Sequence, residues 1–217
     1  MSYDPAACGA KCDICPLGPK GFLRPKDESF SPVGPELHEG AEVVAIAESP
    51  GPREVIEGRP LIGPSGSEWN RALAAAGRTR ADIDLTNVIA CKPPGQASGA
   101  WSRLTSTLQR LNKARAAKEE SAIPHPAECC RPRLLSEIQH YDRLITLGKT
   151  ALQSVTGDTR SVHGARGDLL LVDRHEWLVV GTGRRASSCG HRQVFPTLHP
   201  AFIMRSPAYR DVLHRDL

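Results

Sequence analysis

Residues 42–51 read Glu-Val-Val-Ala-Ile-Ala-Glu-Ser-Pro-Gly, and this stretch decides the fold. A strand is predicted at Glu42–Ala47, in which Val43–Ala47 is a short, β-branched apolar run typical of a strand buried on both faces. A glycine- and proline-rich loop over 48–66 follows and leads into a predicted helix at Ser67–Ala76. A buried strand, a loop and a helix in this order form the repeating unit of parallel α/β sheets.

The same alternation continues along the chain. Further strands are predicted at Asp84–Ala90, Arg143–Leu147 and Phe195–Leu198, with a hairpin formed by Leu169–Val172 and Trp177–Val180. Helices are predicted at Ser102–Glu120, Arg133–Tyr141, Lys149–Val155 and Pro207–Leu217. This pattern predicts one α/β domain over 1–217, with a largely parallel sheet between two helical layers. Ligands of such sheets bind beyond the carboxyl ends of the strands, so we expect the site in the loops after Ala47, Ala90 and Leu198.

Composition limits the class of protein. The chain has 217 residues, of which 40% are hydrophobic and 24% charged, so it can bury a core and global disorder is excluded. Its apolar runs are far shorter than the roughly 20 residues of a membrane span, and its N-terminus is polar. We therefore expect a cytoplasmic protein that is neither secreted nor bound to a membrane. The net charge of +4 permits a nucleic-acid partner without requiring one.

Seven cysteines in such a chain indicate metal or redox chemistry rather than disulfides. Cys12 and Cys15 form a two-ligand clip, and Cys91 and Cys130 would complete a set of four thiolates. Four soft ligands select zinc or an iron–sulfur cluster, and scattered ligands suit a cluster that joins distant segments. The alternative is that Cys91 and Cys130 are small core residues.

Several loop residues have the chemistry of a binding site. Glycine-rich loops that lead into a helix, as in residues 58–66, favour anions, but no Walker lysine follows Gly66, so nucleotide hydrolysis is not expected. Asn87 lies in the second predicted strand, and His199 directly follows the last one. An amide and an imidazole at strand ends can read and protonate a small polar ligand.

Taken together, the motifs resemble the uracil-DNA glycosylase superfamily, and most closely its iron–sulfur branch, family 4. The resemblance runs from the N-terminal cysteines to the closing helix. In the family's order, the chain has Cys12-x2-Cys15-x-Leu17, Gly58-Arg59-Pro60-Leu61-Ile62-Gly63, Asn87 followed by Cys91-Lys92-Pro93-Pro94, Cys130-Arg131-Pro132, Leu147-Gly148-x2-Ala151-Leu152, Arg166-Gly167 and His199-Pro200.

The resemblance implies a central four-stranded parallel sheet and a [4Fe–4S] cluster, in preference to zinc. Its ligands would be Cys12, Cys15, Cys91 and Cys130, so that the irregular segment 1–40 binds the cluster. Cys130 is chosen over Cys129 because Arg-Pro follows the family's fourth ligand. Cys8 remains a possible substitute for Cys12.

The implied activity is that of a monofunctional DNA glycosylase, which flips a non-standard pyrimidine, uracil by default, out of single- or double-stranded DNA and leaves an abasic site. The catalytic residues would be His199 with Glu48 or Glu54. The residues expected to bind the base are Ser49, Pro50, Gly51, Leu61 and Asn87. Those expected to bind DNA are Pro60, Gly63, Ser65, Gly66, Arg184, Arg185 and Arg205. We expect a monomer.

The sequence also departs from the family's pattern. Ala47 precedes Glu48 where the family usually has Gly-Glu, and Leu61 stands where the family stacks a phenylalanine on uracil. A basic insertion over 96–127 lies within the 38 residues between Cys91 and Cys130. These changes favour, as an alternative, a pocket remodelled for a modified pyrimidine of phage DNA, such as hydroxymethylated or glucosylated cytosine, in antiviral defence. A second alternative is a non-catalytic iron–sulfur DNA-binding module.

Overall fold

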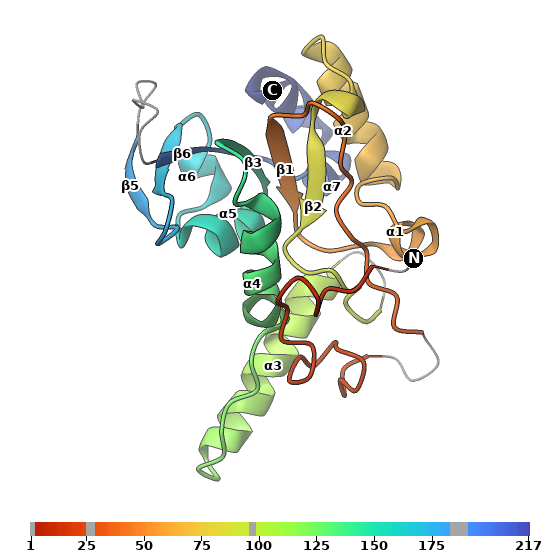
Figure 1. Ribbon diagram of the computed structural model, residues 1–217, viewed down its shortest axis with the longest axis vertical. Coiled ribbons are helices and arrows are strands. Elements are labelled where there is room, and N and C mark those ends of the chain that lie inside the picture. The colour runs from red at the N-terminus through yellow and green to blue at the C-terminus, as the bar shows by residue number, and fades with distance from the viewer. Residues whose placement is uncertain (1–2, 25–28, 96–98, 183–190) are drawn as a thin grey trace.

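The structure is a computed structural model that describes residues 3–24, 29–95, 99–182 and 191–217 (Figure 1). Its centre is one mixed sheet of six strands in the order β2-β1-β3-β6-β4-β5. Four of them run parallel: β1 (Val43–Ala47), β2 (Asp84–Asn87), β3 (Arg143–Leu147) and β6 (His191–Thr197). The other two, β4 (Leu170–Asp173) and β5 (Val179–Thr182), extend the sheet in antiparallel pairing.

The registers of the parallel strands bring their carboxyl ends to one edge of the sheet. Ala47, the last residue of β1, pairs with Asn87, the last residue of β2. Leu147 at the end of β3 pairs with Thr197 at the end of β6. The residues that follow all four strands therefore meet at this edge, as the parallel fold requires.

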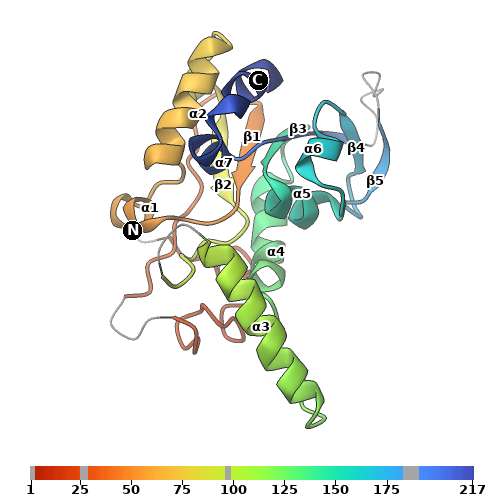
Figure 2. The same cartoon turned by 180° about the vertical axis from the view of Figure 1, so that it is seen from behind.

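Helices cover both faces of the sheet (Figures 1 and 2). One layer contains α2 (Pro64–Ala75), α7 (Pro200–Arg205) and α8 (Arg210–Asp216), preceded by the short α1 (Pro52–Glu57). The other face packs against α3 (Ala100–Ala116), α4 (Pro126–Ile138) and α5 (Lys149–Thr156), with α6 (Val162–Ala165) beside β6. Single turns of 3-10 helix lie at Arg80–Asp82 and Pro207–Tyr209.

The side chains of β1 show how the two layers are built. Val44 and Ile46 are buried among the residues of α3, α4 and α5, whereas Ala45 and Ala47 pack on the opposite face with Trp69 of α2. A strand alternates its side chains between two faces, so a wholly apolar strand demands a helical layer on each side. The expected three-layer α/β/α architecture is confirmed.

Three details of the expected fold are corrected. The sheet has six strands rather than four, because β6 pairs with β4 of the hairpin on its free edge. The loop 48–66 contains a helix, α1, which begins at Pro52, since proline is favoured in the first helical turn. The helix expected at 133–141 is α4, which begins at Pro126 because His125 and Glu128 form a capping box, and it accommodates Pro132 in its interior.

Helix α3 projects from the body of the molecule, and residues 117–125 run back along it (Figures 1 and 2). Leu104 and Leu108 are buried against the core, and the Asn112 amide ties the return segment to the helix. Its Nδ2 donates to the carbonyl of Ile123 at 2.9 Å, and its Oδ1 accepts from the Ile123 N–H at 2.8 Å. Across the described ranges, none of the helices combines the length and the apolar character that a membrane crossing needs.

Candidate active site

A cavity of about 550 Å³ lies at the carboxyl edge of the parallel strands. Each of these four strands delivers at least one polar side chain to its wall. Glu48 follows β1, Asn87 ends β2, Thr150 follows β3, and His199 follows β6. The parallel sheet thus gathers residues from four distant parts of the chain into one site.

The structure brings most of the predicted site residues together. Those that line the cavity are Glu48, Ser49, Pro50, Gly51, Glu54, Leu61, Gly63, Ser65, Asn87, His199 and Arg205. Pro60 and Gly66 are buried outside its wall. The predicted DNA contacts Arg184 and Arg185 lie outside the described residues.

His199 is held in one orientation by the start of α7. It is the N-cap of this helix, and its Nδ1 accepts a hydrogen bond from the Ala201 N–H at 3.0 Å. Burial and the positive charge of Arg205 lower the pKa of His199 to about 4. At neutral pH the ring is therefore uncharged, and because Nδ1 is an acceptor, its hydrogen lies on Nε2. His199 is a neutral hydrogen-bond donor.

Gly148 explains how His199 fits against the loop after β3. Its φ is +87°, a left-handed conformation, and a Cβ at this position would lie 3.2 Å from the Cβ of His199. Its N–H donates to the carbonyl of Thr197 at 2.9 Å. A glycine here lets the two strand-end loops come into close contact.

Glu48 is half-buried in the cavity wall. Its Oε2 accepts a hydrogen bond from the Thr150 hydroxyl at 2.6 Å. Burial raises the pKa of the Glu48 carboxyl above its usual range, while the Thr150 hydroxyl and the charge of Arg205 act in the opposite direction. Glu48 is therefore a carboxyl group whose protonation depends on its immediate neighbours.

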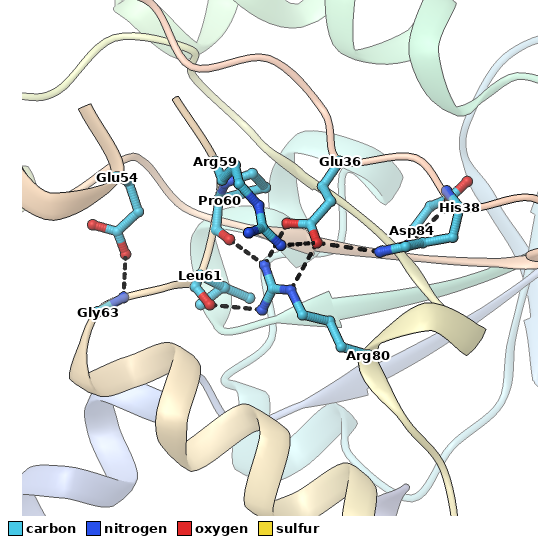
Figure 3. A network of polar contacts seen from close by, with 9 residues as sticks. All are labelled: Glu36, His38, Glu54, Arg59, Pro60, Leu61, Gly63, Arg80 and Asp84. Atoms are coloured by element: carbon cyan, nitrogen blue, oxygen red, sulfur yellow. Dashed lines mark hydrogen bonds and ion pairs between the residues drawn. The ribbon is translucent and has the colours of Figure 1, made fainter. Parts of the chain in front are cut away.

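Glu54 has different surroundings. It lies on α1, is 9% exposed, and accepts a long hydrogen bond from the Gly63 N–H at 3.5 Å (Figure 3). A Cβ on Gly51 would lie 2.5 Å from its Oε2, so Glu54 packs closely against the loop before α1 as well as the loop after it. The hydrogen bond of Glu48, by contrast, is to the loop after β3.

The wall at Leu61 is fixed by a polar network (Figure 3). Leu61 has a φ of +49°, which is uncommon outside glycine, and its carbonyl accepts from Arg80 Nη1 at 2.7 Å. Arg80 also donates to the Pro60 carbonyl and to both oxygens of Glu36, and Arg59 adds an ion pair with Glu36 at 2.8 Å. Burial alone would raise the pKa of Glu36, but the two arginines lower it to about 2.

Pro60 and Gly66 support this wall from behind. The carbonyl of Pro60 is taken by Arg80, and a Cβ on Gly66 would lie 1.8 Å from the carbonyl oxygen of Leu61. Glycine at position 66 therefore allows α2 to pack directly on the Leu61 backbone. Both residues contact protein groups in this structure, and their approach to DNA stays a prediction.

Asn87 is positioned through its backbone. β2 is an edge strand, and on its open side Arg133 of α4 donates hydrogen bonds to the carbonyls of Asn87 and Val88. Arg133 is completely buried and is paired with Glu137 at 2.8 Å, which also accepts from the Thr86 hydroxyl at 2.7 Å. Within the described parts of the chain, no group hydrogen bonds with the Asn87 amide, which lines the cavity.

The cavity also contains residues that the sequence analysis missed. Within the described ranges, the cations Arg53, Lys92 and Lys149 line it beside the predicted Arg205, together with the aromatic side chains of Trp101, His163 and Phe202. Lys149 and Thr150 follow β3, so the strand-end rule applied to that strand as well would have found them. Arg133 and Arg80 act from other elements, and no local motif marks them.

The cysteines face one another on the α3–α4 side of the sheet. Burial and the charges of Cys130 and Cys15 raise the pKa of Cys12 to about 11. The pKa of Cys91 is raised by burial and by Cys130, Cys15 and Cys12, so all four predicted ligands are within electrostatic reach. The Cys15 thiol also hydrogen bonds with Cys129, which keeps Cys129 beside the set.

The donor set is of the kind that an iron–sulfur cluster uses. In the residues that the structure describes, no three His, Cys, Asp or Glu side chains form a group that could hold a metal ion. The thiols of Cys12, Cys15, Cys91 and Cys130 nevertheless raise one another's pKa, and four thiolates are the ligands of an iron–sulfur cluster.

Comparisons with known proteins identify the family of the chain. A family model of the uracil DNA glycosylase superfamily matches residues 35–217, and the chain belongs to this superfamily. A type-4 uracil-DNA glycosylase of Archaeoglobus fulgidus is 40% identical over 185 residues, which are 82% of this chain and 75% of that protein. A type-4 uracil-DNA glycosylase of Thermotoga maritima is 27% identical over 199 residues, 90% of this chain and 79% of the relative.

The chain is therefore a glycosylase enzyme of the family 4-like kind. This confirms the resemblance and the enzyme class, and it disfavours the reading as a non-catalytic module. The roles of individual residues do not follow from the match.

Proposed function

We propose that the protein hydrolyses the N-glycosidic bond of uracil in DNA and leaves an abasic site. The observation that carries the proposal is the meeting of a neutral His199, the amide of Asn87 and the carboxyl of Glu48 in one cavity. These three groups can bind the polar edge of a pyrimidine, stabilise its departure as an anion, and act on the sugar.

The first step is extrusion of the nucleotide from the stack, which costs a few kcal/mol and requires a pocket for the base. The Asn87 amide offers one donor group and one acceptor, which match the O4 and N3–H of uracil. Because β2 and Arg133 fix its backbone, the side chain of Asn87 is already at the cavity before the base arrives.

Bond cleavage leaves the electron pair on the base. The C1′–N1 bond breaks, a water molecule adds its oxygen to C1′ and releases a proton to solvent, and the uracil anion takes up a proton from solvent after it leaves. His199 Nε2–H donates to the developing charge on the base, as a preorganised electrostatic donor. The carboxylate of Glu48 orients the water and stabilises the positive charge on the sugar. The neighbouring Ser49 also lines the cavity.

DNA would approach across the cavity mouth. Arg53, Lys149 and Arg205 are cations from three different elements at the cavity, and they suit the phosphates on either side of the flipped nucleotide. Met204, exposed at 45% beside Arg205, is an apolar side chain that can fill the space that the base vacates. Ser65 contacts Met204 from the opposite wall at 3.9 Å.

We further propose that Cys12, Cys15, Cys91 and Cys130 hold a [4Fe–4S] cluster. When bound, it supplies iron–thiolate bonds that join the N-terminal segment, the loop after β2 and α4. The clustering of the four thiols supports this proposal. The hydrolysis itself requires no electron transfer, so the residues of the cavity perform it.

A second candidate substrate is a modified pyrimidine of phage DNA, such as hydroxymethylated or glucosylated cytosine. The observation that favours it is Leu61, whose aliphatic side chain forms a wall of a cavity of about 550 Å³, much larger than one nucleobase. Under this proposal the enzyme serves antiviral defence rather than repair.

The test is formation of alkali-labile sites in a uracil-containing oligonucleotide and in phage DNA with hypermodified pyrimidines. Breaks in the uracil strand that disappear in His199→Ala support the first candidate, and breaks in the phage DNA alone support the second. Borohydride added during the reaction tests the monofunctional mechanism, because Lys92 and Lys149 both line the cavity. A covalent protein–DNA adduct would contradict hydrolysis by water.

A further inference from the structure

The charged side chains of helix α3 are all of one sign. Residues 100–118 contain five cations and no carboxylate, although the whole chain has a net charge of only +4. A solvated helix usually alternates acidic and basic residues, because like charges three or four positions apart repel. Nothing on this helix balances its charge before Glu119 and Glu120 at its tip.

Helical geometry places three of the five cations on one face. Arg103, Arg110 and Lys113 lie within one side of the helix, and Leu104, Leu108 and Leu111 lie on the other, which packs toward the core. Arg110 and Lys113 are exposed. Arg115 lies on the apolar side, where it pairs with Glu120 at 3.0 Å and donates to the carbonyl of Ser121.

The basic face begins at the active site. Ala100, Trp101 and Ser102, the first turn of α3, line the cavity, and the helix then extends away from the body (Figures 1 and 2). The distance along the axis from Arg103 to Lys113 is about 15 Å at 1.5 Å per residue, which is the length of roughly four to five base pairs.

From these observations we propose that α3 is an arm that binds the DNA backbone beside the flipped nucleotide. Arg110 and Lys113 contact phosphates that the cavity residues do not reach, and no carboxylate within residues 100–118 repels an anionic partner. The proposal rests on DNA being the substrate, and it extends the DNA contact of the proposed function beyond the cavity.

Counterion release gives the test. We would measure binding of the full-length protein to a uracil-free duplex that extends past the cavity on both sides, over a range of salt concentrations. For Arg110→Gln/Lys113→Gln, the slope of log K against log salt should become shallower by about 1.8, since each phosphate contact in B-DNA contributes about 0.9. The substitutions are at exposed positions, so thermal stability should not change.

The matched control is Arg78→Gln/Arg143→Gln. Both residues are exposed near the amino ends of strands, at the edge opposite the cavity, and the net charge changes by the same amount. An equal change of slope in both double variants, or no change in either, would overturn the proposal that α3 binds the DNA backbone. Uracil release is assayed separately. Release by the wild type together with an unaltered slope in Arg110→Gln/Lys113→Gln refutes the role of α3 alone, and a shallower slope without release by the wild type refutes the proposed function alone.

Discussion

At the scale of single residues, the protonation of His199 makes the stability of the protein depend on pH. Because burial and Arg205 lower its pKa from 6.5 to about 4, the folded protein binds fewer protons than the unfolded chain between these two values. Stability is therefore complete above about pH 6.5 and is lost as the pH falls toward 4, by about 3 kcal/mol in total.

Urea unfolding of the wild type and of His199→Asn between pH 4 and pH 7 checks this expectation. Asparagine preserves the N-cap but does not titrate, so the variant should lack this part of the pH dependence. Its activity at neutral pH should fall by about 10²–10³, as expected for the loss of one preorganised donor. Identical pH dependence in the two proteins would show that His199 is not the titrating group.

A second expectation concerns Glu48 and Thr150. The Thr150 hydroxyl stabilises the carboxylate, so in Thr150→Val the pKa of Glu48, already raised by burial, should rise further. The acid limb of the profile of kcat/KM against pH should then move to higher pH, because the carboxylate is lost earlier as the pH falls. Thr150→Ser keeps the hydroxyl and should restore the wild-type profile. An acid limb that stays in place in Thr150→Val would exclude Glu48 as the group that controls it.

At the scale of elements, the packing of α2 on the Leu61 backbone can be tested at Gly66. In Gly66→Ala the new methyl group meets the Leu61 carbonyl oxygen at 1.8 Å, so the wall of the base pocket must move. We expect KM for uracil-DNA to rise by roughly tenfold or more, with a loss of stability of about 1–3 kcal/mol. Gly181→Ala, where the nearest atom is 3.7 Å away, is the control and should behave like the wild type. Equal kinetics in both variants would show that the wall tolerates displacement.

How far the sequence predicted the site depends on the kind of contact. Glu48, Asn87 and His199 were predictable because parallel strands bring their carboxyl ends together. The contacts of Arg133 with Asn87 and of Arg80 with Leu61 join residues 46 and 19 positions apart in the chain, and no periodicity encodes them. The helix α4 was predicted to begin at Arg133, whereas the cap at His125 begins it earlier, at Pro126.

At the scale of the whole molecule, the proposed cluster joins three separated segments. We expect Cys91→Ala to lose its bound iron and to lower Tm by roughly 10 °C or more, because two long loops are no longer cross-linked. Cys8→Ala should keep its iron if Cys12 is the ligand. Iron and sulfide analysis with thermal unfolding checks both variants. Full iron content in Cys91→Ala would remove Cys91 from the ligand set.

Arg133 gives α4 a significance beyond packing. The helix carries Cys130, and one turn later its buried guanidinium donates to the backbone carbonyl of Asn87, the residue proposed to bind the base. Helix α4 thus connects one proposed cluster ligand, Cys130, to the backbone of Asn87. We therefore expect substitutions that shift α4 to alter which base is accepted, even where they do not touch the cavity.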